Sequence, residues 1–429
     1  MLSVISYHTP EGKQAVEKIL SRSQLESPGV QETVDRILAD VKNKGDEALF
    51  GYTKEFDHIT LTKETIRVSE AEIEAAYQKV SPELVQVIRQ AAERIRAFHE
   101  KQKQNSWFDT KPNGEILGQL IRPLARVGVY VPGGKAAYPS SVLMNVMPAH
   151  VAGVEEIIMT TPAQKDGSVY PTTIVAAKEA GVTAIYKVGG AQAIAALAYG
   201  TSSVPKVDKI CGPGNIFVAL AKRTVYGHVN IDSVAGPSEI LVLADKTARA
   251  DYVAADLLSQ AEHDPMASAI AITDDADLAQ AIAKEVEAQT AVLERKEIIE
   301  TSLKDFGAII LVDDMNEAVE IANGIAPEHM EISTAEPFSL LPKVKNAGAV
   351  FLGHFSPEPL GDYMAGPNHV LPTGGTARFF SPLSVDDFVK KSSIISFSKE
   401  ALLPLSDSII AFANAEGLTA HANAVRIRK

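Results

Sequence analysis

The feature that most constrains this chain is an alternation, from about residue 126 onward, of short β-branched runs with alanine-rich stretches of helical spacing. The runs form two series, one at 127–131, 156–159, 184–188 and 207–210, the other at 240–243, 268–272, 308–312 and 349–352. Alternation of this kind is typical of βαβ units, which build parallel sheets covered by helices. We therefore expect an α/β fold with two Rossmann-like α/β domains, the first at 126–236 and the second at 237–381.

The chain on either side of the two series follows other patterns. In 30–56 and 82–104, apolar residues recur at three- to four-residue spacing among charges, which predicts amphipathic helices. We expect an N-terminal helical extension at 1–25 and a helical segment at 26–125 that packs with the second α/β domain. Residues 382–429 have too little apolar surface to fold alone, so this tail must pack on the body of the protein or on another subunit.

Composition narrows the classes of protein that remain. The 429 residues are 46% hydrophobic and 22% charged, which is ordinary for a globular protein and excludes a largely disordered chain. A formal net charge of −13 makes nucleic acid and an anionic membrane poor partners. The N-terminus lacks the basic start and the unbroken apolar run of a secretion signal, so we expect a cytoplasmic protein.

The sequence contains a single cysteine, Cys211. It cannot form an internal disulfide or a cysteine-rich zinc site, so a metal would have to be held by His, Asp, Glu or amide side chains. A thiol before a glycine turn could act as a nucleophile. A lone cysteine at the end of an apolar strand is more often an inert core residue, and we expect that packing role here.

Three glycine-containing turns leave strands of the first series, at 131–135, 189–190 and 211–215. Glycines at strand ends let the backbone approach a ligand, and the helix N-termini behind them favour phosphate. Together the turns suggest a nucleotide site. The G-x-G-x-x-G fingerprint with its following acid is absent, and the glycines could instead serve only tight strand-to-helix turns.

Two pairs of polar residues in the second series have metal-binding or acid–base chemistry. Gln260 and His263 are three apart near the end of a helix stopped by Pro265, which places both on one side of that helix. Glu328 and His329 follow a proline at a helix-to-strand transition and have the groups for general-base chemistry near neutral pH. The first pair could equally be a solvated helix face, and the second a surface turn.

Two later segments add polar groups. Residues 353–375 form a long loop, rich in proline and glycine, that carries Asp362, Asn368 and His369, and loops of this length tend to be functional. Near the C-terminus, 416–421 is a polar segment with a glycine joint, which alone is typical of an ordinary helix start. The residues by themselves indicate an α/β protein with a candidate nucleotide pocket and a candidate metal site without cysteine.

Taken together and in chain order, these segments closely resemble the histidinol dehydrogenase family over the whole chain. The motifs that carry the resemblance are VYVPGG (129–134), GGAQA (189–193), GPGN (212–215), AGPSE (235–239), SQAEHDP (259–265), APEH (326–329), GDYMAGPNH (361–369) and EGLTAHA (416–422). The resemblance implies the last two oxidations of histidine biosynthesis. In these, L-histidinol passes through L-histidinal to L-histidine with two NAD molecules and one bound zinc per subunit.

The same resemblance implies roles for individual residues. The implied zinc ligands are Gln260, His263, Asp362 and His421. The implied NAD contacts are Tyr130, Gln192 and Asn215. The implied substrate contacts are Ser238, Gln260, His263, His329, Asp362, Glu416 and His421. Of the two implied bases, His329 takes the alcohol proton and Glu328 activates water. In the family the C-terminal segment reaches the neighbouring subunit, which implies a homodimer with a shared active site and makes 382–429 a dimerisation tail.

Two other classes of function remain compatible with the residues. The same ligands, with Glu328 and a metal-bound water, describe a zinc hydrolase, although the three glycine turns argue against it. A non-catalytic nucleotide-binding or scaffold protein could use the same fold. Whether the metal is zinc or manganese, and which subunit donates each ligand, also stays open.

Overall fold

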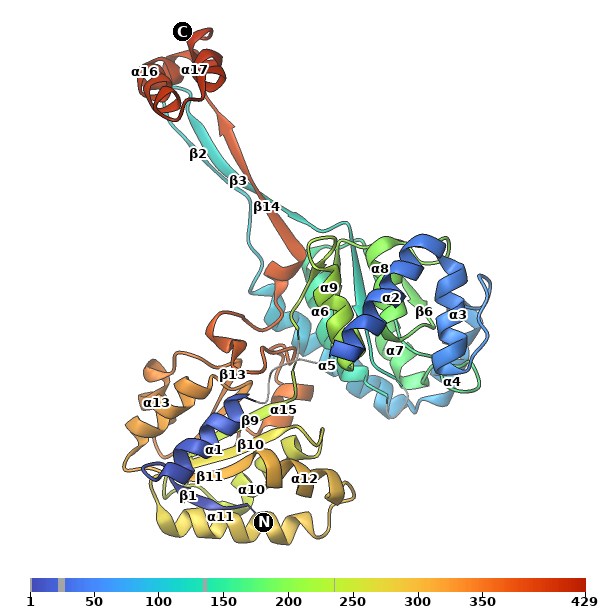
Figure 1. The fold of residues 1–429 in the computed structure, drawn as a ribbon, viewed down its shortest axis with the longest axis vertical. Helices are drawn as coiled ribbons and strands as arrows, with labels where there is room; N and C mark the ends of the chain where they lie inside the picture. The colour runs from blue at the N-terminus through green and yellow to red at the C-terminus, as the bar shows by residue number, and fades with distance from the viewer. Residues whose placement is uncertain (1, 22–27, 134–136, 235) are drawn as a thin grey trace.

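The computed structural model describes the whole chain except residues 1, 22–27, 134–136 and 235. It contains two α/β bodies, each built on a parallel sheet, and a narrow arm that projects away from them (Figure 1). None of the described helices has the length and apolar character needed to cross a membrane. The α/β class with parallel sheets, expected from the alternation, is confirmed.

The first body is built on a five-stranded sheet in the order β6-β5-β4-β7-β8. Its strands are β4 (Arg126–Tyr130), β5 (Glu156–Thr160), β6 (Ala184–Tyr186), β7 (Lys209–Cys211) and β8 (Asn230–Ile231). The helices between them are α6 (Pro139–Ala152), α7 (Pro171–Ala180), α8 (Gly190–Tyr199) and α9 (Ile216–Val225). Val129 pairs with Met159 on one side and Cys211 on the other, and all three are fully buried, so β4 crosses the core.

Four helices from the N-terminal part cover this first body. They are α2 (Pro28–Lys44), α3 (Asp46–Asp57), α4 (Glu70–Lys79) and α5 (Pro82–Glu100). Helix α2 packs against α8 and α9, α3 against α8, α4 against α7, and α5 against α6 and α7. Ile37 and Leu49 share a core with Ile194 and Leu197. The expectation that 26–125 packs with the second α/β domain is wrong, because the apolar faces of these helices are buried on the first body.

The second body is built on a six-stranded parallel sheet in the order β1-β11-β10-β9-β12-β13. Its strands are β1 (Val4–Ser6), β9 (Glu239–Ala244), β10 (Ser268–Thr273), β11 (Gly307–Leu311), β12 (His329–Ser333) and β13 (Ala349–Leu352). Its later helices are α10 (Ala250–Ala261), α11 (Ala276–Thr290), α12 (Lys296–Phe306), α13 (Met315–Ile325), α14 (Pro337–Leu340) and α15 (Glu358–Tyr363). Strands β9 and β10 are buried along their whole lengths, as central strands of a sheet covered on both faces should be.

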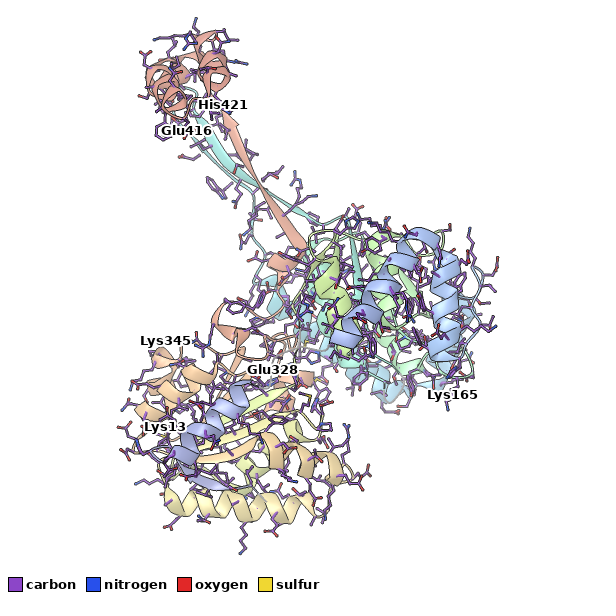
Figure 2. The ribbon with its side chains drawn as sticks, in the orientation of Figure 1. Lys13, Lys165, Glu328, Lys345, Glu416 and His421 are labelled. Carbon is purple, nitrogen blue, oxygen red and sulfur yellow. The ribbon has the colours of Figure 1, made fainter. Side chains whose placement is uncertain are left out.

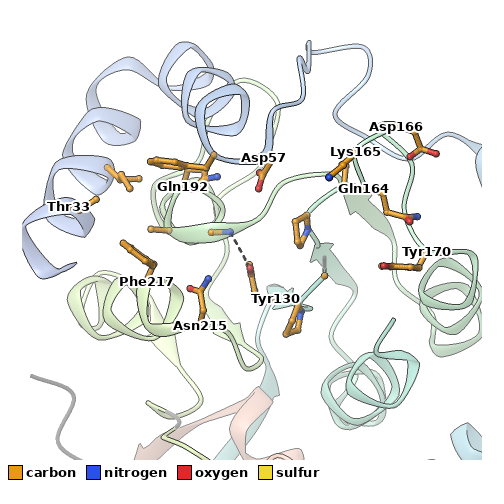
Figure 3. Close-up of a pocket in the computed structure, with 18 residues that line it drawn as sticks. Thr33, Asp57, Tyr130, Gln164, Lys165, Asp166, Tyr170, Gln192, Asn215 and Phe217 are labelled. Atoms are coloured by element: carbon orange, nitrogen blue, oxygen red, sulfur yellow. Dashed lines mark hydrogen bonds between the residues drawn. The ribbon is translucent and has the colours of Figure 1, made fainter. Parts of the chain in front are cut away.

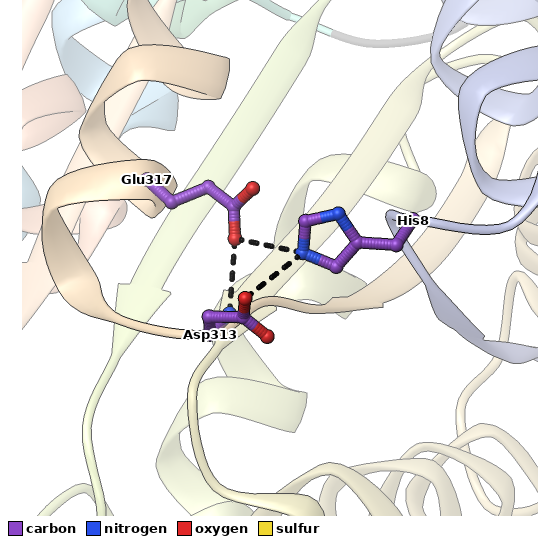
Figure 4. Close-up of side chains that lie close together, drawn as sticks. All are labelled: His8, Asp313 and Glu317. Carbon is purple, nitrogen blue, oxygen red and sulfur yellow. Dashed lines mark hydrogen bonds and ion pairs between the residues drawn. The ribbon is translucent and has the colours of Figure 1, made fainter.

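The N-terminal extension contributes a strand as well as a helix to the second body. Strand β1 pairs with β11 at the edge of the sheet, and α1 (Pro10–Ser21) follows. Between them, His8 Nε2 lies 3.4 Å from Asp313 Oδ2 and 3.3 Å from Glu317 Oε2, beside the start of α13 (Figure 4). Residues 4–6 are thereby held against a segment some 300 residues later in the sequence.

The arm consists of an antiparallel sheet with two helices at its tip (Figure 1). The sheet has the order β14-β3-β2, with β2 (Trp107–Thr110), β3 (Ile116–Pro123) and β14 (Val389–Ser396). The helices α16 (Lys399–Ala415) and α17 (Thr419–Arg426) pack on each other. Large apolar side chains of the arm are exposed, among them Ile395, Phe412 and Ile427, so the tail does not bury them on its own chain.

The chain also contains short 3₁₀ turns, which lie at Leu341–Lys343, Thr376–Arg378 and Val385–Phe388.

Candidate active site

A cavity of about 1020 Å³ opens at the carboxyl ends of β4, β6 and β7 in the first body (Figure 3). Tyr130, Gln192 and Asn215, the residues expected to contact NAD, all line it. Residues 134 and 135 of the first glycine turn lie outside the described residues. In parallel sheets, ligands bind outside the carboxyl ends of the strands, and small-ligand pockets span roughly 300–1,000 Å³. The cavity therefore has the position and the size to hold a dinucleotide.

Hydrogen bonds fix the walls of this cavity. The N–H of Gly190, at the start of α8, donates to Tyr130 Oη at 3.1 Å. Gly190 has φ +67°, a conformation that favours glycine. Asn215 caps α9, its Oδ1 accepting from the Val218 N–H at 3.2 Å. Burial raises the pKa of Tyr130 to about 12, so its phenol stays protonated and can donate to a ligand oxygen.

A smaller pocket, of about 160 Å³, lies at the amino ends of β9 and β12 in the second body. It brings together six of the residues expected to act in catalysis, substrate binding or metal binding: Ser238, Gln260, His263, Glu328, His329 and Asp362. Gly212 and Pro213 of the first body also line it. Since Asn215 of the same turn lines the large cavity, the 211–215 turn borders both spaces.

Glu328 is held at the start of β12 by reciprocal hydrogen bonds with the start of β9. The Glu239 N–H donates to Glu328 Oε2 at 2.9 Å, and the Glu328 N–H donates to Glu239 Oε2 at 3.2 Å. Burial, followed by the nearby charge of Glu239, raises the pKa of Glu328 well above its usual value. A carboxylate with a raised pKa is a stronger base than an exposed one.

His329 presents one nitrogen to the backbone and the other to the pocket. Its Nδ1 lies 2.9 Å from the carbonyl oxygen of Glu239. A carbonyl oxygen can only accept, so Nδ1 carries the hydrogen and Nε2 of the neutral ring is left as an acceptor. Nε2 lies 3.8 Å from Glu358 Oε1. Burial lowers the pKa of His329 to about 4, so the ring is neutral at pH 7 and Nε2 can take a proton.

The same pocket contains side chains of the kind that bind a divalent metal. Gln260, in the last turn of α10, has a buried Oε1 with no hydrogen-bond partner among the described residues. His263 follows the end of that helix, and Asp362 lies in α15. Zinc sites without cysteine are built from such nitrogen and oxygen donors, and an orphaned buried oxygen is accounted for when a metal binds it. The residues present therefore fit a metal ion.

Two buried acids at the pocket were not singled out from the sequence as site residues. Glu239 exchanges with Glu328 the hydrogen bonds described above. Glu358, His329 and Asp362 each offer one possible metal-ligand atom, and these three atoms lie within 4.8 Å of one another. Burial, with the charge of Asp362, raises the pKa of Glu358 to about 9. Glu239 ends a segment that carried the family resemblance, which was the available signal, but no sequence pattern shows that either acid is buried.

Glu416 and His421 do not lie at this pocket. Both are exposed at the tip of the arm, well separated from Glu328 (Figure 2). In the single chain the structure therefore assembles three of the four expected metal ligands.

The turn between the two spaces is fixed by a buried ion pair. Lys222 Nζ donates to the Gly212 carbonyl oxygen at 2.8 Å and pairs with Asp232 Oδ1. Asp232 Oδ2 accepts from the Gly212 N–H at 2.8 Å. Only 3% of the Lys222 side chain and 5% of the Asp232 side chain are exposed. The pair thus ties both backbone groups of Gly212, whose φ of +111° also requires glycine.

We expect Lys222→Met to destabilise the protein by about 3–5 kcal/mol, because it leaves the Asp232 carboxylate buried without its cation. Urea unfolding followed by circular dichroism measures the loss. The matched control is Lys44→Met, which removes an exposed partner of Asp40 and should cost less than about 1 kcal/mol. Equal losses for the two variants would show that the buried pair does not stabilise this turn.

Cys211 is fully buried in β7. Burial raises the pKa of its thiol well above the usual value, so the nucleophilic thiolate is disfavoured. These properties support the packing role expected for this residue.

The parallel sheets, the dinucleotide-sized cavity at strand ends and the buried glutamate–histidine pair beside metal-type donors are features of an α/β enzyme. A family model described as histidinol dehydrogenase matches residues 20–429. A histidinol dehydrogenase from Halalkalibacterium halodurans is 60% identical over 93% of each chain. One from Clostridium acetobutylicum is 54% identical over 100% of this chain and 99% of its own.

A crystal structure of histidinol dehydrogenase from Elizabethkingia anophelis is similar with a TM-score of 0.94 and 39% identity, covering 100% of this chain and 98% of that one. The chain belongs to the histidinol dehydrogenase family. The resemblance carried by the sequence motifs is confirmed, and the protein is an oxidoreductase. Membership of this family leaves the hydrolase and scaffold alternatives without support.

Proposed function

We propose that this protein oxidises L-histidinol through L-histidinal to L-histidine in two successive NAD-dependent steps. The observation that carries the proposal is the placement of the Glu328–His329 pair and three metal-type donors in one small pocket. That pocket shares the 211–215 turn with the cavity that fits a dinucleotide. A substrate carbon bound in the small pocket can therefore face a nicotinamide ring entering from the large cavity.

When bound, NAD accepts a hydride from the substrate carbon in each step, and zinc orients the imidazole and amino nitrogens of the substrate. Gln260, His263 and Asp362 would hold one zinc per subunit, with His421 of the partner subunit as the fourth ligand. Tyr130, Gln192 and Asn215 would contact NAD. Ser238 would contact the substrate together with the residues around the metal.

His329 acts in the first oxidation. Its Nε2 accepts the hydroxyl proton of the alcohol while the hydride leaves the same carbon, and the product is the aldehyde. Glu328 acts next by taking a proton from the water that adds to the aldehyde. The hydrated aldehyde then loses a second hydride, which NAD would accept, and a proton, and the resulting carboxylic acid ionises to the carboxylate. Both residues are buried, which limits the access of bulk water to their side chains.

We further propose a homodimer in which the tail, 382–429, completes the active site of the partner. Glu416 and His421 are exposed at the arm tip and cannot meet the pocket of their own chain in this conformation. Trp107, Ile395 and Phe412 give the arm exposed apolar surface of the kind that subunit interfaces bury.

A spectrophotometric titration tests the proposed reaction. With limiting L-histidinol and excess NAD, absorbance of the reduced cofactor should rise to two equivalents per histidinol. Removing the metal with a chelator should abolish the rise, and adding zinc back should restore it. No reduction of NAD by the zinc-loaded protein would rule the proposal out, and a plateau at one equivalent would restrict it to the alcohol step.

A further inference from the structure

Asp57 is the last residue of α3 and lines the large cavity (Figure 3). Its Oδ2 is buried and has no hydrogen-bond partner among the described residues. Leaving a buried carboxylate oxygen unsatisfied costs free energy, and such groups in native proteins usually have a functional explanation. Burial raises the pKa of this carboxyl by more than the nearby His58 lowers it.

The only other acid that lines the cavity among the described residues is already engaged. Asp166 Oδ1 accepts hydrogen bonds from the Ser168 N–H at 2.9 Å and from Ser168 Oγ at 2.7 Å. Asp166 and the neighbouring Lys165 are exposed, so solvent and salt screen their charges. Asp57 is thus the acid that can give a bound ligand a strong, unshared acceptor.

The position of Asp57 indicates which end of a dinucleotide it would meet. The reactive end has to lie near the 211–215 turn, because that turn borders the catalytic pocket. In the view of Figure 3, Asp57 lies beside Gln192, apart from Asn215, which lies beside Tyr130. Phe56, the residue before Asp57, also lines the cavity and offers an apolar contact for a purine ring. The adenosine half therefore lies on the Asp57 side.

The adenosine half of NAD carries hydrogen-bond donors that a carboxylate can accept. The adenosine ribose of NAD presents two adjacent hydroxyl donors, whereas that of NADP carries a 2′-phosphate that a buried carboxylate repels. In dinucleotide-binding folds an acid placed after the glycine-rich turn usually performs this recognition, and this sequence lacks that fingerprint. We propose that Asp57, supplied by the N-terminal helical segment, binds the adenosine ribose hydroxyls and makes the cavity selective for NAD over NADP. This inference rests on the NAD-dependent function proposed above.

The test compares cofactors rather than activity alone. For Asp57→Asn we expect kcat/KM for NAD to fall roughly ten- to a hundredfold through KM, as loss of a hydrogen bond to a charged group does. The ratio of kcat/KM for NAD to that for NADP should fall as well, since the repulsion is removed. The melting temperature of the cofactor-free protein should not fall, because Oδ2 of Asp57 has no hydrogen bond to lose among the described residues. The control is Glu55→Gln, which removes a charge from the same helix outside the cavity.

The outcomes separate this inference from the proposed function. A wild-type protein that reduces NAD, together with an Asp57→Asn variant of unchanged KM and unchanged cofactor ratio, overturns the role of Asp57 alone. A wild-type protein that neither reduces nor binds NAD overturns both. If ADP-ribose binds the variant as tightly as the wild-type protein in calorimetry, the adenosine half does not contact this carboxylate and the inference fails.

Discussion

Replacing His329 by asparagine should lower kcat for histidinol oxidation by about 10²–10⁴-fold, the usual contribution of a general base. Asparagine is chosen because it can keep one hydrogen bond of the native histidine. An asparagine amide can still donate to the Glu239 carbonyl oxygen, as Nδ1 does at 2.9 Å, but it places no basic nitrogen where Nε2 faces the pocket. Steady-state NADH formation measures the effect, and zinc content determined by atomic absorption should stay at one per subunit.

Glu328→Gln separates the two oxidations. Glutamine can still accept from the Glu239 N–H, so the link between β9 and β12 is kept, while the proposed base for the water is lost. Oxidation of supplied L-histidinal should therefore fall much further than oxidation of L-histidinol, and the NADH yield should drop from two equivalents toward one. The exposed Glu320→Gln, on α13, is the control for a removed charge. Equal losses in both half-reactions would contradict the separate role of Glu328.

The position of the large cavity could be predicted from the sequence because it follows a general rule. Glycine turns after β4, β6 and β7 predict a ligand at the carboxyl edge of a parallel sheet, and Tyr130 and Asn215 lie there. The second pocket lies at the amino ends of β9 and β12, where that rule gives no guidance. From spacing alone, Glu328 and His329 could not be distinguished from residues of a surface turn. Only the resemblance to a family predicted that they share a site with Asp362.

Periodicity also failed to identify packing partners. The helical pattern of 30–56 and 82–104 correctly indicates that one face of each helix is buried, but it does not specify the surface that buries it. Helix α2 joins the core of the first body through Ile37, contrary to expectation. The same helical segment brings Asp57 to the cavity, a contact that depends on how α3 packs against α8 and so has no signature in local sequence.

The arm raises the question of where its polar residues act. Glu416 and His421 are exposed at a tip that stands away from both bodies (Figure 2), although the pocket holds only three of the four proposed metal ligands. A ligand on the arm of one subunit and a base on the body of the other predict complementation. His421→Asn should nearly abolish turnover by weakening the metal site, and His329→Asn, on the body, should lower it by about the same 10²–10⁴-fold as above.

Mixing these two inactive variants, unfolding them together and refolding them should restore activity. Random pairing makes half of the dimers mixed, and each mixed dimer has one site with His329 of one chain and His421 of the other intact. Its second site carries both substitutions and stays inactive, so turnover should recover to about one quarter of the wild-type value. If each chain instead built its own site, every site would carry one lesion. Mixed dimers, isolated through two different affinity tags, would then remain inactive and the shared site would be excluded.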